Sequence, residues 1–174
     1  MAADFVNTKG WIGGSERLGG TDEVRAFLVA HGEDKRVTKA DIPKLHTLRD
    51  RVRAVFTAAN DGLARRQINA LLADFPTRPR LANDGEHDVT FEPGGNDAVS
   101  WIGANAALGL AFFVAEHGTT RLGICGASDC DDAYVDGSKN STKHCCSPKC
   151  TRLENVRAFR ARQHAKRAGS NNLQ

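Results

Sequence analysis

Two short stretches, CGASDC at residues 125–130 and CSPKC at residues 146–150, set the architecture of the last third of this chain. They contribute two close pairs of cysteines, separated by a segment long enough for a short hairpin. All five cysteines of the chain lie between residues 125 and 150, and the N-terminus shows no secretory signal. In such a chain, clustered cysteines indicate metal ligands more than disulfides.

Two pairs of thiolates suit one tetrahedral zinc ion, and four protein ligands leave no open position for a substrate water. The sequence therefore predicts one structural zinc ion, because so small a segment cannot bury enough apolar surface to fold without it. The alternatives are an iron–sulfur cluster, disulfides or free thiols. Cys145 is the surplus cysteine, and it or His144 competes for a ligand position. The predicted ligands are Cys125, Cys130, Cys146 and Cys150.

A basic helix should leave the metal site, because no glycine or proline follows Cys150 until Gly169. Its apolar side chains Leu153, Val156 and Phe159 fall on one side and are expected to cover the hairpin. From residue 137 to the end, nine lysines and arginines stand against one glutamate, a net charge of +8 that leaves −5 for residues 1–136. This asymmetry favours a polyanionic partner over a merely solvated tail. An adjacent stripe on the helix carries Arg157, Arg160, His164 and Arg167.

The first 120 residues are predicted to form a mainly helical body. Apolar spacing predicts helices after Thr21, over residues 41–59 with Pro43 in the first turn, and around residues 68–72. Residues 80–82 and 89–91 flank the turn-forming cluster Asn83-Asp84-Gly85, which predicts a small β-hairpin.

Residues 98–115 form an Ala/Gly-rich apolar stretch that is better explained as a buried core helix than as a membrane span. Gly103 and Gly109 would then mark close packing of another element. The expected fold class is α+β, and the protein is expected to be cytoplasmic and free of the membrane. The expected domains are a body over residues 1–120, a zinc finger with its basic helix over residues 121–168, and a disordered tail over residues 169–174.

The finger resembles the CGNR zinc finger family, through residues 125–138, CSPKC at residues 146–150 and FRAR at residues 159–162. FVNT at residues 5–8 and the helix around Leu48-Arg49 resemble the ABATE domain, which precedes this finger in stress-induced transcription regulators. The resemblance covers nearly the whole chain and implies an α/β body followed by a treble-clef-like finger. Two positions depart from the family pattern. Leu153 replaces an arginine of the name-giving tetrapeptide, for which Arg152 could partly substitute, and Cys145 stands where an aromatic residue is usual.

The resemblance and the charge together predict a regulator that binds double-stranded DNA through the finger, with a body that senses a signal or dimerises. The alternative is a zinc-dependent protein-interaction module, and several of the arginines could instead cover the acidic body. Phosphate contacts would carry most of the affinity, and arginine–guanine pairs the specificity. The expected DNA-binding residues are Lys139, Lys143, Lys149, Arg152, Arg157, Arg160, Arg162 and Arg167.

An enzyme is not expected, because the six histidines are scattered and form no known catalytic motif. The glycine-rich segment 10–20 lacks both phosphate-binding patterns. Asn7 and Thr8, beside Trp11, could line a pocket for a small-molecule effector or make ordinary hydrogen bonds at a strand end.

Overall fold

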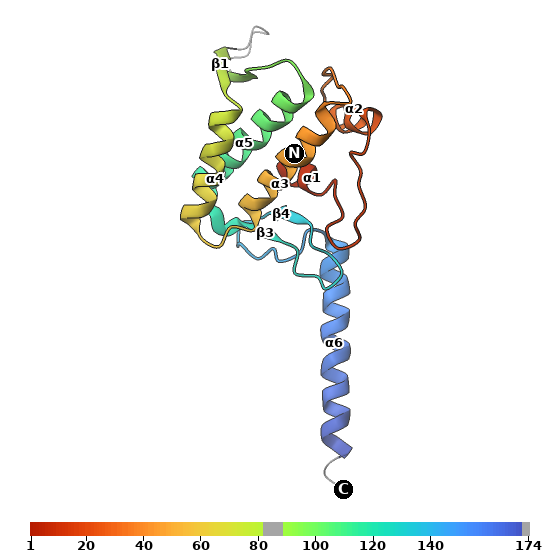
Figure 1. Ribbon diagram of the computed structural model, residues 1–174. Helices are drawn as coiled ribbons and strands as arrows, with labels where there is room; N and C mark the ends of the chain where they lie inside the picture. Colours follow the sequence, from red (N-terminus) through yellow and green to blue (C-terminus); the bar gives the residue numbers. More distant parts are fainter. Residues whose placement is uncertain (82–88, 172–174) are drawn as a thin grey trace.

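The computed structural model describes residues 1–81 and 89–171, with side chains through residue 163. It shows an α+β protein, in which a helical body is followed by a small hairpin, a cysteine cluster and a long C-terminal helix (Figure 1). The helices are α1 (Ala2–Val6), α2 (Thr21–Ala30), α3 (Asp41–Phe56), α4 (Asp61–Asp74), α5 (Ala98–His117), the short 3₁₀ turn η1 (Thr119–Arg121) and α6 (Pro148–Asn171). The strands are β1 (Thr77–Leu81), β2 (Val89–Pro93), β3 (Leu122–Ile124) and β4 (Ala133–Val135).

Local signals account for several helix boundaries. Asn60 caps α4 by accepting a hydrogen bond from the Leu63 amide at 2.9 Å, and Asp97 caps α5 through the Ser100 amide at 3.0 Å. Gly32 follows α2 with a φ of +76°, the left-handed conformation that ends many helices. The helices expected from apolar spacing are therefore confirmed, with α3 ending three residues earlier than expected.

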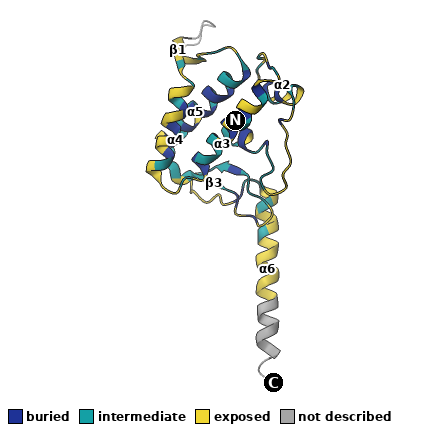
Figure 2. Ribbon diagram, in the orientation of Figure 1, coloured by how far each residue is buried: buried dark blue, intermediate teal, exposed yellow. Residues whose placement is uncertain are grey.

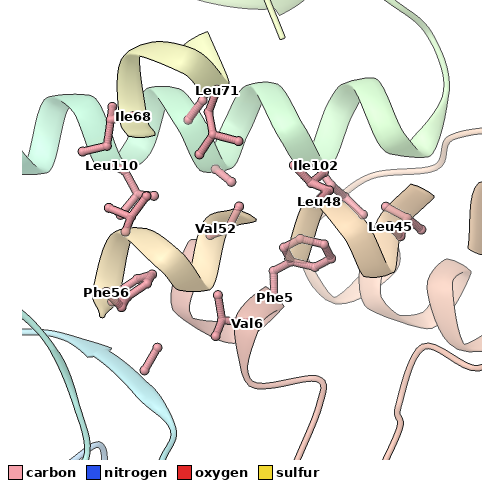
Figure 3. Close-up of a cluster of buried hydrophobic side chains, with 14 of the residues drawn as sticks. Phe5, Val6, Leu45, Leu48, Val52, Phe56, Ile68, Leu71, Ile102 and Leu110 are labelled. Carbon is pink, nitrogen blue, oxygen red and sulfur yellow. The ribbon is translucent and has the colours of Figure 1, made fainter. Parts of the chain in front are cut away.

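The core of the body lies where α1, α3, α4 and α5 meet (Figure 3). Phe5 and Val6 from the five-residue α1 are fully buried there, so this short helix contributes directly to the core. The other labelled core side chains are Leu45, Leu48, Val52 and Phe56 of α3, Ile68 and Leu71 of α4, and Ile102 and Leu110 of α5.

Helix α5 is long and apolar enough to cross a membrane by length and composition. Eight of its residues are buried against the other helices of the body, among them Ile102, Ala106 and Leu110. The expectation of a core helix is confirmed.

The predicted hairpin forms from β1 and β2, which pair antiparallel with Leu81 opposite Val89. The turn expected at residues 83–85 lies outside the described residues. This hairpin stands at the end of the body remote from α6 (Figure 1).

The second hairpin, β3 and β4, belongs to the finger by sequence but packs into the body. Ala133 is 1% exposed and joins the main core, and Leu122, Ile124 and Val135 pack against it. The finger is therefore joined to the body along this hairpin, and only α6 projects freely (Figure 1).

The apolar side chains of α6 do not cover the hairpin, so that expectation is wrong. Leu153, Val156 and Phe159 are 47%, 44% and 56% exposed, because the helix leaves the body after its first two turns (Figure 2). The helix continues to Asn171, three residues into the segment expected to be a tail, and residues 172–174 lie outside the described residues.

The two helix-interior glycines of α5 differ in their surroundings. A Cβ on Gly103 would lie 2.4 Å from the Phe75 ring, which confirms close packing there, whereas a Cβ on Gly109 would meet nothing within 4 Å. We expect Gly103→Ala to lower the free energy of unfolding by about 1–3 kcal/mol through overpacking. The matched change Gly109→Ala should raise it by up to about 1 kcal/mol, because alanine is the better helix former. Urea unfolding of both variants tests this contrast, and equal effects would contradict it.

Candidate metal centre and basic helix

The first cysteine pair sits in a tight turn at the end of β3. Cys125 follows Ile124 directly, and its amide donates to the Asp132 carbonyl at 2.8 Å, which extends the pairing of the hairpin. The Cys130 amide donates a hydrogen bond to the Ala127 carbonyl at 3.1 Å. This turn brings the thiols of Cys125 and Cys130 to the same point.

The second pair is placed by the start of α6. Ser147 precedes the helix and its hydroxyl accepts the Cys150 amide at 3.3 Å, while Pro148 takes the first helical position, where a missing N–H costs nothing. Cys146 therefore lies just before the helix and Cys150 in its first turn. The helix that carries the basic residues is thus anchored at the cysteine cluster.

The four predicted ligands converge, with their Sγ atoms all within 4.8 Å of one another. The Sγ atom of Cys146 lies 3.6 Å from that of Cys130 and 3.7 Å from that of Cys150. A tetrahedron with zinc–sulfur bonds of about 2.3 Å has edges of about 3.8 Å. A disulfide would need about 2.05 Å. The spacing fits four sulfurs around one ion.

Burial and hydrogen bonds from backbone amides shift the pKa of these thiols in opposite directions. Burial raises the pKa of Cys130 to about 12 and raises that of Cys146 further. At Cys125 burial acts in the same direction, but amide hydrogen bonds from Cys146 and Ala127 outweigh it and lower its pKa. Because burial raises the pKa of Cys130 and Cys146, a metal that binds these thiols as thiolates must displace their protons.

This donor set fits zinc. Four thiolates close the tetrahedral shell, and the hydrogen bond that the Cys146 amide donates to the Cys125 sulfur, at 3.3 Å, would orient that sulfur from outside the shell. A bound ion would hold the turn at Cys125–Cys130 against the first turn of α6. Its role would be structural, because no ligand position stays open.

Cys145 is packed against the cluster but is not one of the four converging thiols. It is 9% exposed and lies in the same small apolar cluster as Cys125 and Ala127. A cavity of about 560 Å³ opens beside it, between the loop and α6, with Lys143 and Arg152 also in its wall.

A second contact ties α6 to the cysteine turn on the same side of the helix. Glu154 accepts hydrogen bonds from the Ser128 amide at 3.0 Å and the Ser128 hydroxyl at 3.1 Å. Arg157 then bridges Glu154, at 2.8 Å, and Asp129 of the turn. These two carboxylates pair with Arg157, one of the residues expected to contact DNA, near the start of the helix.

The finger is held to the body by two polar contacts. The side-chain amide of Asn7 donates to the Ala133 carbonyl at 2.9 Å, and its oxygen accepts the Ala133 amide at 2.7 Å. Arg53 of α3 donates to the Asp131 carbonyl at 3.0 Å and lies over the ring of Trp11 at 4.1 Å. Asn7 thus completes the edge of a strand 126 residues away.

The neighbouring Thr8 makes a buried link within the body. Its hydroxyl donates to the Phe5 carbonyl at 2.7 Å and accepts a hydrogen bond from Arg49 at 3.0 Å. Arg49 is 1% exposed and forms a bidentate ion pair with Glu16. The FVNT stretch and Leu48-Arg49, far apart in sequence, therefore meet in one place. The interpretation of Asn7 and Thr8 as residues that make ordinary hydrogen bonds fits these contacts, but they follow helix α1 and do not end a strand.

The remaining basic residues fall into two groups. Lys143 donates to the Val135 carbonyl at 3.2 Å and lies over the Tyr134 ring, beside the cysteine cluster. Along α6, Arg152, Arg160 and Arg162 are exposed, and within the described part of the chain none of them makes an ion pair. Lys139 and Lys149 are also exposed. The side chains of His164 and Arg167 lie outside the described residues.

Family comparisons match both parts of the chain. A family model named ABATE and described as "Putative stress-induced transcription regulator" matches residues 1–117. This protein belongs to the ABATE family. A CGNR zinc finger model matches residues 121–163 of the same ABATE protein, which covers all four converging cysteines. Both families are of non-enzymatic kinds. A search of curated proteins finds no match.

Proposed function

We propose that this ABATE protein is a cytoplasmic transcription regulator that binds double-stranded DNA through α6, with one zinc ion fixing the root of that helix. The observation that carries the proposal is a basic helix that projects alone from the body (Figure 1). Its 24 residues span about 36 Å at 1.5 Å per residue. A helix of this kind fits the major groove, which is about 12 Å wide.

The contacts at the root of α6 divide the helix into two faces. Cys150, Glu154 and Arg157 face the cysteine turn, so the opposite face is left for a partner. That face carries Arg152 and Phe159, with Val156 and Arg160 along one flank and Arg162 along the other. Arginines can pair with guanine, and apolar side chains can contact the methyl group of thymine.

Basic side chains at both ends of this face would contact the DNA phosphates. Lys143 and Arg152 line the cavity next to the first turn of α6, where the positive end of the helix dipole also favours an anion. Lys139 and Lys149 stand exposed nearby in sequence, and Arg162 lies further along the helix. We retain all of these as DNA contacts and leave out Arg157, which is occupied by Asp129 and Glu154.

A selection from random duplex DNA tests the proposal. We expect the zinc-loaded protein to enrich a motif, and the double variant Arg160→Ala, Arg162→Ala to lose it and to bind at least about tenfold more weakly, because one arginine–guanine pair contributes about 1–3 kcal/mol. If both arginines also neutralise phosphates, the salt slope should fall by about 1.8. The charge-matched control is Arg25→Ala, Arg65→Ala in the body. Equal losses in both double variants would contradict a specific role for α6.

A protein-interaction module is the second candidate function, because Leu153, Val156 and Phe159 stay exposed on α6. Such a module would bind one defined protein partner at a fixed ratio, with little dependence on salt. Binding that instead follows DNA length and salt concentration favours the DNA-binding regulator.

The body would supply the regulatory input, either by sensing a signal or by dimerising. A cavity of about 360 Å³ lies between α1 and α2, within the size range of small-ligand sites. Its wall includes Asp4, Arg17, Phe27 and His31, beside Asn7 and Thr8. An effector bound there would touch the same residue, Asn7, that holds the finger to the body.

A further inference from the structure

Helix α5 is apolar on nearly all sides, yet the body covers only part of it. Over residues 98–115 it contains no charged residue. A helix that is hydrophobic all round is normally buried all round. In this chain Gly109 and Phe112 are exposed, and Trp101, Asn105 and Leu108 are half-buried beside them. The outward side of α5 is therefore a largely apolar face that the rest of the described chain covers only in part.

The β1–β2 hairpin extends this face. Phe91 of β2 packs against Phe112 of α5 with ring centroids 5.7 Å apart. Leu81 and Val89, paired across the hairpin, are 73% and 53% exposed, and Phe112 is 57% exposed. We call the surface made by Leu81, Val89, Phe91, Gly109 and Phe112 the end patch.

We infer that two copies of this chain associate through their end patches. This names a surface for the dimerisation offered above as one role of the body, and it rests on that proposal without depending on DNA binding. A two-fold pair brings the same patch together from both copies, so the patch must complement itself. An uncharged, apolar patch does so without placing like charges in contact. Arg80 and Glu92, which pair across the hairpin at 2.9 Å, neutralise each other within each copy.

The exposed area suits such a pairing. A fully exposed aromatic side chain offers about 200 Å², so the four apolar side chains of the patch expose on the order of 400 Å² per copy. Two copies would bury about 800 Å² from these side chains alone, half of the roughly 1,600 Å² of a standard interface. The surface of α5 around Leu108 and Gly109 can supply a large share of the rest.

We expect the two copies to associate by side-chain packing and not by adding a strand of one copy to the hairpin of the other. Pro79 stands in the middle of β1 and has no N–H to offer to a further strand. Gly109, where a Cβ would meet nothing within 4 Å, allows a neighbouring helix to approach α5 closely. The contact would therefore join α5 and the hairpin of one copy to the same elements of the other.

Sedimentation equilibrium of the full, zinc-loaded chain tests this inference over about 1–100 μM protein, where dimers of moderate affinity dissociate. We expect the wild type to approach twice its mass of 18.8 kDa. Phe112→Asp and Leu81→Asp should each weaken the dimer at least tenfold. Gly109→Leu should weaken it too without lowering monomer stability, because space is open at that position. The matched control is Val29→Asp on α2, where the valine is 67% exposed outside the patch.

Several outcomes would overturn the inference. A wild type that stays at 18.8 kDa throughout, a dimer that survives both patch variants, or a dimer broken by Phe159→Asp on α6 would each do so. A failure of the proposed DNA binding can be distinguished from a failure of the dimer inference. The end patch shares no residue with α6, so a monomeric Phe112→Asp variant should still show salt-dependent binding to DNA if the proposed function holds.

Discussion

Cys150→Ser should abolish tight zinc binding and release α6 from the finger while the helical body stays folded. Cys150 supplies one of four converging thiols and stands in the first turn of α6. Structural zinc sites contribute about 10–16 kcal/mol of binding free energy in small fingers. Loss of one thiolate from a closed shell should weaken binding by well over 100-fold, since even removal of a supporting group outside the shell costs about 10–100-fold. Competition with a coloured chelator measures the affinity.

The body should survive because its core does not depend on the metal. From the finger, the main core receives Ala133, with Leu122, Ile124 and Val135 packed against it, and none of the four ligands. Hydrogen exchange should therefore show loss of protection in residues 125–130 and 146–160 and retention in α3 and α5. The prediction that the whole finger unravels without zinc thus applies to the cysteine turn and α6 more than to the β3–β4 hairpin.

Cys145→Ser is the matched control, because this residue adjoins Cys146 but lies outside the four converging thiols. It should keep one zinc ion with an affinity within about tenfold of the wild type. If Cys145→Ser loses zinc and Cys146→Ser keeps it, the ligand assignment is wrong.

Arg49→Met should strongly destabilise the body. The guanidinium of Arg49 is buried and holds both oxygens of Glu16 and the hydroxyl of Thr8. Removal of one partner from a buried ion pair costs about 3–5 kcal/mol, and Glu16, which is 31% exposed, can recover some hydration, so we expect about 3 kcal/mol. The control is Arg51→Met on the same helix, whose exposed pair with Asp74 at 2.6 Å should contribute no more than about 1 kcal/mol.

The same ion pair predicts how stability depends on pH. The hydrogen bonds and charge of Arg49 lower the pKa of Glu16 from 4.5 to about 2. A carboxyl group whose pKa is lower in the folded state stabilises the protein above its unfolded pKa and loses that contribution as pH falls. Stability should therefore decrease between about pH 4.5 and 2, and Arg49→Met should flatten this part of the profile. Urea unfolding from about pH 7 to 3 measures it, and an unchanged slope in the variant would contradict the assignment.

The sequence by itself determined the local features of this protein. The convergence of four cysteines could be predicted because two close cysteine pairs restrict the geometry within a few residues. The helices follow from periodic apolar positions, and the basic character of α6 follows from its composition. The sequence also predicts a boundary between body and finger after residue 120; in the structure α5 ends at His117 and Gly118 follows it with a φ of +79°.

Only the tertiary structure decided which charged and polar side chains are paired within the protein. Arg157 and Arg160 look alike in sequence, yet Arg157 is held by Asp129 across 28 residues and Arg160 is left free of ion pairs in the described structure. Asn7 meets Ala133 over 126 residues, and Arg49 meets Glu16 over 33. Such pairings leave no periodic pattern, because they arise only after packed helices have brought distant backbone segments together. The direction of α6, away from the body with its apolar side chains exposed, has the same origin.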